Sequence, residues 1–184
     1  MKTGRNRELD LLKGFGIFLM VLDHVGWGNT VHIYIQSFHM PLFFIVSGYL
    51  WKSRESVSSF CQNRAKSVLL PYYSFAAIYL LLLVAVVRCK LIEQSIFLAV
   101  KALLLYPTDM PNMPFAPALW FLPCFWLSNV VYALLDKWLL QRKWVLVLIV
   151  TALGMLYSSL SDKMLPFCLE PVAVAIFFLY VGEF

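Results

Sequence analysis

The sequence predicts an all-α fold, a polytopic bundle of about six transmembrane helices with one interfacial amphipathic helix. Composition is the first reason: 61% of the 184 residues are apolar, only 14% are charged, and the mean hydropathy is +0.77. A typical soluble domain is about half apolar and about a quarter charged. The second reason is that apolar runs recur along the chain, each near the length of about 20 residues that a helix needs to cross a bilayer. A soluble globule of this size cannot bury so much apolar surface, so the lipid bilayer is the first expected partner.

The first expected span, residues 9–26, follows a basic N-terminus and is interrupted by Asp10, Lys13 and Asp23. These charges, and the lack of a small-residue cleavage site after the apolar stretch, argue against a signal peptide and favour an uncleaved span. A short loop without Lys or Arg is expected next, at residues 27–34. The later expected spans are residues 35–51, 67–87, 118–135, 144–160 and 167–184.

Three connecting segments have distinct compositions. Residues 52–66 are polar and basic and separate the second span from the third. In residues 88–106 apolar side chains recur with helical period, but charged residues such as Glu93 lie among them, which is typical of an interfacial amphipathic helix. Residues 107–117 contain four prolines and are expected to form an ordered loop. The whole chain, 1–184, is expected to form a single membrane domain.

Positive charge predicts the orientation of this bundle, whose formal net charge is +5. With a cytoplasmic N-terminus, ten Lys and Arg residues face the cytoplasm and four face outside, as the positive-inside rule requires. The ten are Lys2, Arg5, Arg7, Lys52, Arg54, Arg64, Lys66, Lys137, Arg142 and Lys143, and the four are Arg88, Lys90, Lys101 and Lys163. The chain is therefore expected to be a multi-pass protein of the cell membrane, plasma or inner. Because the basic residues lie at span edges and form no continuous patch, no nucleic-acid partner is expected.

Neither a metal centre nor a disulfide framework is predicted. The chain has four cysteines, and no CxxC motif is present. Without the spacing of metal ligands, no metal site is expected.

Ionisable groups inside a span are costly and need a reason. Lys13 and His24 are eleven residues apart, so at helical period they lie on one face, about 16 Å apart along the axis. Asp10 lies one turn before Lys13 and is positioned to pair with it. Such a polar stripe indicates a face that points into the bundle or into a water-filled cavity. The alternative is that Asp10 and Lys13 are boundary residues that snorkel, with His24 an interfacial histidine near the outer end.

Two further groups in the first half of the chain are candidates for function. His39, near the start of the second span, is either a second proton-handling group or a hydrogen-bonded core residue. The neighbouring Ser47 and Gly48 are small enough to let helices approach closely, which favours a packing role over a catalytic one. Arg64 and Lys66 are either positive-inside anchors or a binding site for a phosphorylated cytoplasmic cofactor.

Two candidates lie in the second half of the chain. Trp120 is expected to be an aromatic residue of the interface or of the packing between helices. Glu170 is a carboxylate in the last apolar run, or a residue at its outer boundary.

Four sequence motifs, in order along essentially all of the chain, carry a family resemblance. They are Arg-Glu-Leu-Asp-Leu-Leu-Lys-Gly at residues 7–14 followed by His24, Ser-Phe-His-Met-Pro-Leu-Phe-Phe-Ile-Val-Ser-Gly-Tyr-Leu at 37–50, Leu-Leu-Pro-Tyr at 69–72, and Leu-Trp-Phe-Leu-Pro at 119–123. Together they resemble the integral-membrane acyltransferase-3 family, and in particular its fucose-4-O-acetylase-like branch.

The resemblance implies an O-acyltransferase that takes an acyl group, usually acetyl, from cytoplasmic acyl-CoA. The acceptor would be a hydroxyl of a cell-surface or exported sugar or polysaccharide. Acyl-CoA would be a donor substrate, and no tightly bound cofactor is implied. By resemblance His24 takes the catalytic position and Lys13 is its basic partner, with Asp10 beside Lys13.

The remaining candidates receive secondary roles. Arg64 and Lys66 would bind acyl-CoA, while His39, Trp120 and Glu170 would contact or support the substrates.

The chain departs from the family pattern in two places. Members often have Arg-x-x-Arg before the third span, and here Ser67 stands at the second position, next to Lys66. Members also have more spans than this chain holds. The chain is therefore expected to correspond to the N-terminal part of such an enzyme, lacking a C-terminal half or needing a partner chain.

Two other classes of function remain open from the residues alone. In a transporter or flippase subunit, the same buried charges would form a proton or solute path. In a noncatalytic membrane scaffold they would have only structural roles. The acyltransferase-like motifs favour the enzyme, because transport alone does not require them.

Overall fold

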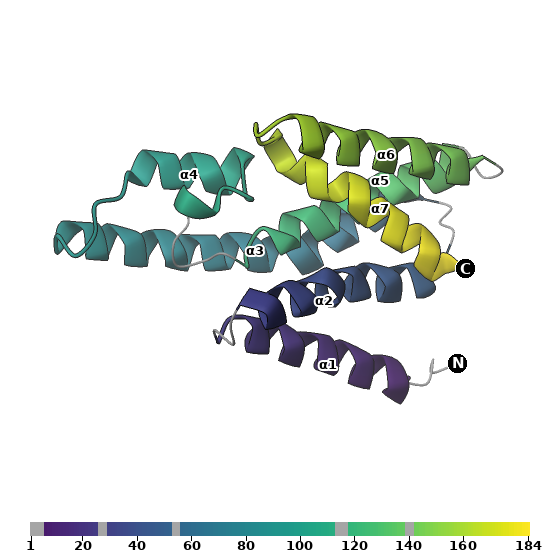
Figure 1. Ribbon diagram of the computed structural model, residues 1–184, viewed down its shortest axis with the longest axis horizontal. Helices are drawn as coiled ribbons and strands as arrows, with labels where there is room; N and C mark the ends of the chain where they lie inside the picture. The colour runs from purple at the N-terminus through teal and green to yellow at the C-terminus, as the bar shows by residue number, and fades with distance from the viewer. Residues whose placement is uncertain (1–5, 26–28, 53–55, 113–117, 139–141) are drawn as a thin grey trace. The chain divides into compact units, whose positions relative to one another are not determined.

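A computed structural model describes residues 6–25, 29–52, 56–112, 118–138 and 142–184. Within these ranges the chain forms seven α-helices and two short 3₁₀ turns, and no β-strand is present (Figure 1). The predicted all-α fold class is therefore confirmed. The helices divide into two compact units, residues 1–52 with 177–184 and residues 53–176, and each unit is described by itself.

Three segments of the described chain are long and apolar enough to cross a membrane: Val57–Arg88, Lys143–Leu160 and Pro166–Glu183. They correspond to the third, fifth and sixth expected spans. Little of the first two is buried inside the protein, which agrees with side chains that face lipid. The helices at the other three expected spans are shorter or carry more polar residues.

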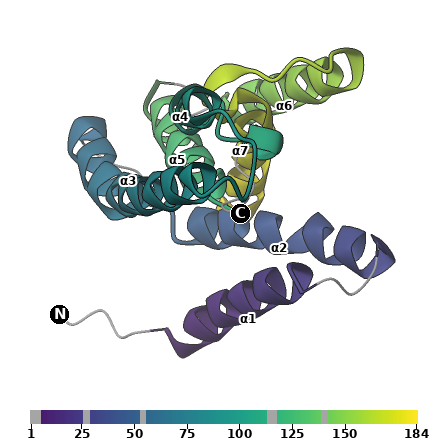
Figure 2. The same cartoon turned by 90° about the vertical axis from the view of Figure 1, so that its left-hand side faces the viewer.

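In the first unit, α1 (Arg7–Asp23) and α2 (Asn29–Tyr49) lie side by side in both views (Figures 1 and 2). The side chain of Asn6 caps α1 by accepting hydrogen bonds from the backbone N–H groups of Glu8 and Leu9, at 3.1 and 3.4 Å. Gly16 is buried against the side chains of Leu42 and Phe43 on α2. A Cβ atom at position 16 would lie only 3.0–3.3 Å from these side chains, which would have to shift to make room for it.

The expected loop at residues 27–34 is wrong for most of its length, because α2 begins at Asn29. A tertiary contact lies within this stretch. His32 pairs with Asp23 on α1, which holds the first turn of α2 against α1. Residues 27 and 28 lie outside the described residues.

The second helix also crosses the end of α7 (Leu169–Glu183) in the first unit, and two glycines allow the close approach. A Cβ atom at Gly48 would overlap the carbonyl of Leu179, and one at Gly182 would overlap the carbonyl of Ile45. The two backbones therefore meet with no side chain between them. The prediction that small residues in 47–48 serve helix packing is supported by this geometry.

In the second unit, α3 (Val57–Arg88) is the longest helix and begins ten residues before the expected third span. Ser56 caps it by accepting a hydrogen bond from the N–H of Ser59 at 3.3 Å. The expected basic segment at residues 52–66 is therefore helical from Val57 onwards, because a polar sequence with a good cap can extend a span beyond the apolar region.

Two helices pack along α3, namely α4 (Ile96–Leu105) and α5 (Phe121–Trp138). Helix α4 is shorter than the amphipathic helix expected at residues 88–106, because α3 continues to Arg88 and Ser95 caps α4. Its buried residues are Ala99, Ala102 and Leu103, and the hydroxyl of Tyr72 on α3 donates a 2.5 Å hydrogen bond to the carbonyl of Leu103.

The loop expected at residues 107–117 is ordered where the structure describes it. A 3₁₀ turn, η1 (Met110–Asn112), ends at Asn112, whose backbone carbonyl accepts a hydrogen bond from the hydroxyl of Tyr79 at 3.3 Å. The side chain of Asn112 donates to Asp109 at 2.8 Å and accepts from Gln94 at 3.2 Å. Residues 113–117 lie outside the described residues.

The last helices of the second unit are α6 (Lys143–Leu160) and the first half of α7, which follows the 3₁₀ turn η2 (Pro166–Cys168). The buried hydroxyl of Thr151 on α6 donates a 2.9 Å hydrogen bond to the carbonyl of Ala173 on α7. One turn later, a Cβ atom at Gly154 would collide with the Cβ of Ala173. The two helices therefore approach closely near the cavity that is lined by the last turns of α6 and the first turns of α7.

Candidate functional site

His24, the predicted catalytic residue, follows the last residue of α1 and caps its C-terminus. Its side chain is exposed, and Nδ1 lies 2.7 Å from the carbonyl oxygen of Met20. A carbonyl only accepts hydrogen bonds, so the network assigns the proton of the neutral imidazole to Nδ1. The lone pair is then on Nε2. The imidazole is thus arranged to accept a proton at Nε2.

Lys13 and Asp10 lie on α1 as the sequence predicts, and both are half-buried. Within the described residues, however, Lys13 forms no ion pair with Asp10. The spacing of one turn allows such a pair but does not require it. Asp10 instead lines an open hollow along α1, together with Arg7, Gly14 and Phe18. Lys13 and His24 remain about 16 Å apart along the helix axis.

Sequence reasoning missed an aspartate–histidine pair at the same end of α1. Nδ1 of His32 lies 2.7 Å from Oδ1 of Asp23, and the side chain of Asp23 is only 1% exposed, against 44% for His32. The other oxygen, Oδ2, is buried without a hydrogen-bond partner in the described part of the chain. Asp23, an acidic residue near the end of an apolar span, could have indicated such a pair. His32, however, lies in the segment that the sequence predicts to be a loop.

His39 is buried in the middle of α2, with an exposed fraction of 1%. Its Nδ1 lies 2.8 Å from the carbonyl oxygen of Ile35, whereas Nε2 is buried without a partner among the described residues. This geometry fits a hydrogen-bonded core residue better than a proton-handling group, because an acceptor hydroxyl cannot reach the fully buried ring of His39 without a rearrangement.

Arg64 and Lys66, the predicted donor-binding residues, have different environments. The guanidinium group of Arg64 lies 5.6 Å from the ring centroids of both Phe60 and Phe125, and it donates to Asn129 across the α3–α5 contact at 3.5 Å. Arg64 therefore helps to join two helices. The side chain of Lys66 is exposed and is available to a ligand.

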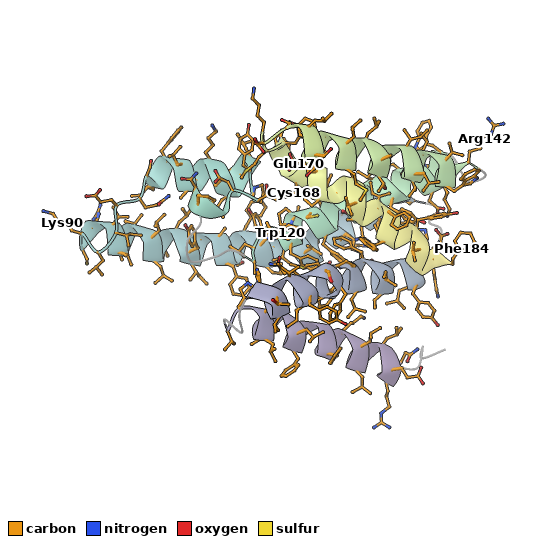
Figure 3. All side chains as sticks on the ribbon, in the orientation of Figure 1. Lys90, Trp120, Arg142, Cys168, Glu170 and Phe184 are labelled. Atoms are coloured by element: carbon orange, nitrogen blue, oxygen red, sulfur yellow. The ribbon has the colours of Figure 1, made fainter. Side chains whose placement is uncertain are left out.

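The structure brings Trp120 and Glu170 together, although they are fifty residues apart in sequence. Both line a cavity of about 620 Å³ in the second unit. Figure 3 shows Trp120, Cys168 and Glu170 near one another, where α5 and α7 begin. The thiol of Cys168 contacts the carbonyl oxygen of Trp120 at 3.9 Å, and Oε1 of Glu170 accepts a 2.9 Å hydrogen bond from the N–H of Leu165. The first contact involves the backbone of Trp120, and the second holds the side chain of Glu170 at the cavity wall.

Among the described residues, no group of three or more His, Cys, Asp or Glu side chains converges. The groups that are available are imidazoles, carboxylates and lysines, which suit proton transfer and the binding of anions.

Residues 6–182 match the family of acyltransferase domains named Acyl_transf_3. The chain belongs to the acyltransferase-3 family. Among curated proteins, it is 34% identical over 90 residues to the nodulation protein NolL of Sinorhizobium fredii (strain NBRC 101917 / NGR234), an alignment that covers 41% of this chain and 25% of NolL. No solved structure matches the chain. The predicted family is thus confirmed, while these matches single out no branch within it.

For an acyltransferase-3 protein, the described residues place the candidate groups in three settings. His24, Lys13 and Asp10 lie on one helix of the first unit. Lys66 lies on α3, and Trp120 and Glu170 line the cavity of the second unit. The apolar helices and the family match together indicate a membrane protein of the acyltransferase-3 family.

Proposed function

We propose that this chain is a membrane O-acyltransferase that moves an acyl group, acetyl in the simplest case, from acyl-CoA to a hydroxyl of a sugar or polysaccharide. The observation that carries the proposal is His24, because its side chain is exposed and its Nδ1 is engaged by the carbonyl of Met20. An accessible imidazole with its lone pair on Nε2 is the arrangement that a general base needs.

In the proposed reaction, Nε2 of His24 takes the proton of the acceptor hydroxyl as its oxygen attacks the thioester carbonyl carbon. A new C–O bond forms, the C–S bond breaks, and CoA leaves as a thiolate. The imidazolium then returns its proton to the sulfur, so the products are an ester and the free thiol of CoA. No oxidant, reductant or metal is needed for this balance.

Lys13 is proposed to bind negative charge of the donor. It lies about 16 Å from His24 along α1, which is too far for contact with the reacting carbonyl. Acyl-CoA is long and carries its phosphates far from the thioester, so one helix could contact both parts. Lys13 has no ion pair within the described residues, which leaves its ammonium group available.

The test is acyl transfer by the purified chain in lipid nanodiscs. With acetyl-CoA and a neutral saccharide acceptor, we expect release of CoA thiol that depends on the acceptor, together with an acetylated sugar detected by mass spectrometry. Thiol release that is the same with and without acceptor would contradict transfer. A solute flux across proteoliposomes without any acetylated product would favour the transporter instead.

The donor assignment predicts different effects for the two basic residues on α3. Replacing Lys66 by Gln should raise KM for acyl-CoA by about tenfold without loss of stability, because an exposed cation that contacts a phosphate is lost. Arg64→Gln should also loosen the α3–α5 contact, since the guanidinium of Arg64 on α3 contacts the ring of Phe125 and Asn129 on α5. Initial rates at varied acyl-CoA and thermal unfolding of each variant separate the two effects. A Lys66→Gln protein with the donor KM of the wild type would contradict this role.

We further propose that the N-terminus is cytoplasmic, and this orientation predicts that Cys89 is accessible from outside the cell. Cys89 is exposed at the C-terminal end of α3, beside Arg88 and Lys90. With half-buried Cys61 replaced by Ser, a membrane-impermeant thiol reagent should label Cys89 in intact cells, because Cys124 and Cys168 are buried. A cysteine at exposed Lys137, in a Cys61→Ser, Cys89→Ser background, should be labelled only after lysis. The opposite labelling pattern would reverse the orientation.

A further inference from the structure

The cavity of about 620 Å³ lies where the outer turns of α6 and α7 meet the segment that follows α4. Ser158 lies near the end of α6 and Glu170 near the start of α7, while Thr108 follows α4 and Trp120 directly precedes α5. Met155, Pro171 and Val174 complete much of an apolar wall. Small-molecule sites commonly have such a wall, with a few polar groups that orient the ligand.

The polar groups of this wall have unused hydrogen-bonding capacity. Glu170 uses Oε1 to accept from Leu165, which leaves Oε2 for a ligand. A molecule with several hydroxyl groups could bind Oε2 of Glu170 and the exposed hydroxyl of Ser158, and its C–H faces would fit the ring of Trp120 and the apolar wall.

Charge disfavours the phosphates of acyl-CoA in this cavity. Its lining contains the carboxylate of Glu170 and no Lys or Arg among the described residues. The phosphates of CoA would meet a like charge without any compensating cation. A neutral ligand would not meet this repulsion.

The position of the cavity, at the end of α6 and the start of α7, agrees with an acceptor that enters from outside the cell. Helix α6 begins at Lys143, directly after Arg142, and ends at Leu160 beside the cavity. In the proposed orientation the basic end of α6 is cytoplasmic, so the cavity opens at the outer edge of the membrane. Ser158 and Glu170 then lie at the level where a water-soluble sugar can enter.

We propose that this cavity binds a neutral sugar ring of the acyl acceptor, with the ring packed on Trp120 and hydrogen-bonded by Glu170 and Ser158. The role as acceptor rests on the proposed function, whereas the binding of a neutral saccharide does not. The cavity is thereby assigned to the acceptor and separated from the cationic groups proposed to bind the donor.

Binding of neutral methyl glycosides to the purified chain in nanodiscs tests this assignment without any catalytic step. Methyl glucoside, galactoside, mannoside and fucoside are titrated by saturation-transfer NMR, with methyl glucuronide as the anionic counterpart. We expect at least one neutral glycoside to bind, and the glucuronide to bind more weakly than the glucoside because of Glu170.

Two variants probe the wall of the cavity. Trp120→Leu and Glu170→Gln should each raise Kd by about tenfold, the change that accompanies loss of one strong contact. Gln at position 170 keeps an oxygen for the N–H of Leu165, so Glu170→Gln stays informative if Trp120→Leu fails to fold. Trp138→Leu and Asp162→Asn are matched controls on exposed residues outside the cavity and should change Kd by less than about twofold.

The outcomes separate this inference from the proposed function. Failure of every neutral glycoside to bind, or wild-type Kd values in Glu170→Gln, would overturn the saccharide site. Acceptor-dependent acetyl transfer with an unchanged acceptor KM in Glu170→Gln would also overturn it, while leaving the acyltransferase reaction intact. Saccharide binding that is lost in both variants, without any acetyl transfer, would support the site and count against the proposed reaction.

Discussion

Replacing His24 by Gln is expected to lower kcat of acyl transfer by about 10²–10⁴-fold, the usual contribution of a general base. Glutamine keeps a polar side chain that can still donate to the carbonyl of Met20, but it cannot accept and return a proton. His24→Ala should lower kcat to a similar extent. Stability should change little in either variant, because the side chain of His24 is exposed. Steady-state kinetics with saturating acyl-CoA and a thermal unfolding curve measure both effects.

A His24→Gln protein with near-normal turnover would reject the base role. The next candidate would then be His32 and not the buried His39. His32 is accessible, and the buried carboxylate of Asp23 holds its Nδ1 at 2.7 Å, which is how a general base is often oriented. His32→Gln, measured beside His24→Gln, would show which imidazole the reaction uses.

Replacing Lys143 by Met is expected to destabilise the protein by about 3–5 kcal/mol, the usual cost of removing one partner of a buried ion pair. Nζ of Lys143 lies 2.9 Å from Oδ1 of Asp136, and the two side chains are only 15% and 4% exposed. The same ammonium group also lies 5.6 Å from the ring centroid of Tyr132. Loss of the cation would leave a carboxylate in a poorly solvated position between α5 and α6.

Denaturant titration of the chain in detergent micelles, followed by circular dichroism, measures this loss. Lys137→Met is the matched control, because Lys137 is an exposed residue of α5, and it should change stability by less than about 0.5 kcal/mol. The double variant Asp136→Leu, Lys143→Met should recover much of the stability, since apolar residues can replace a buried pair. Equal stability of Lys143→Met and Lys137→Met would contradict a structural role for the pair.

Local rules predicted much of the fold. Long apolar runs are enough to place α3, α6 and α7, because a bilayer selects helices by length and hydropathy alone. The starts of α2 and α3 were missed because both lie in polar sequence. A capping serine at position 56 and a pair between His32 and Asp23 extend these helices beyond their apolar parts.

The sequence by itself determined the fold class, the family and a helix on which Lys13 and His24 are separated by a set distance. These properties depend on composition, on motif order and on helical period, which can all be determined along the chain without tertiary contacts. Only the tertiary structure decided that Arg64 stacks between two phenylalanine rings, that Asp23 holds His32, and that Trp120 and Glu170 share a cavity. Each of these arrangements brings together residues from different elements of the chain. Their geometry depends on the packing of side chains and on backbone approach at small residues such as Gly154, neither of which has a signature in the spacing along the chain.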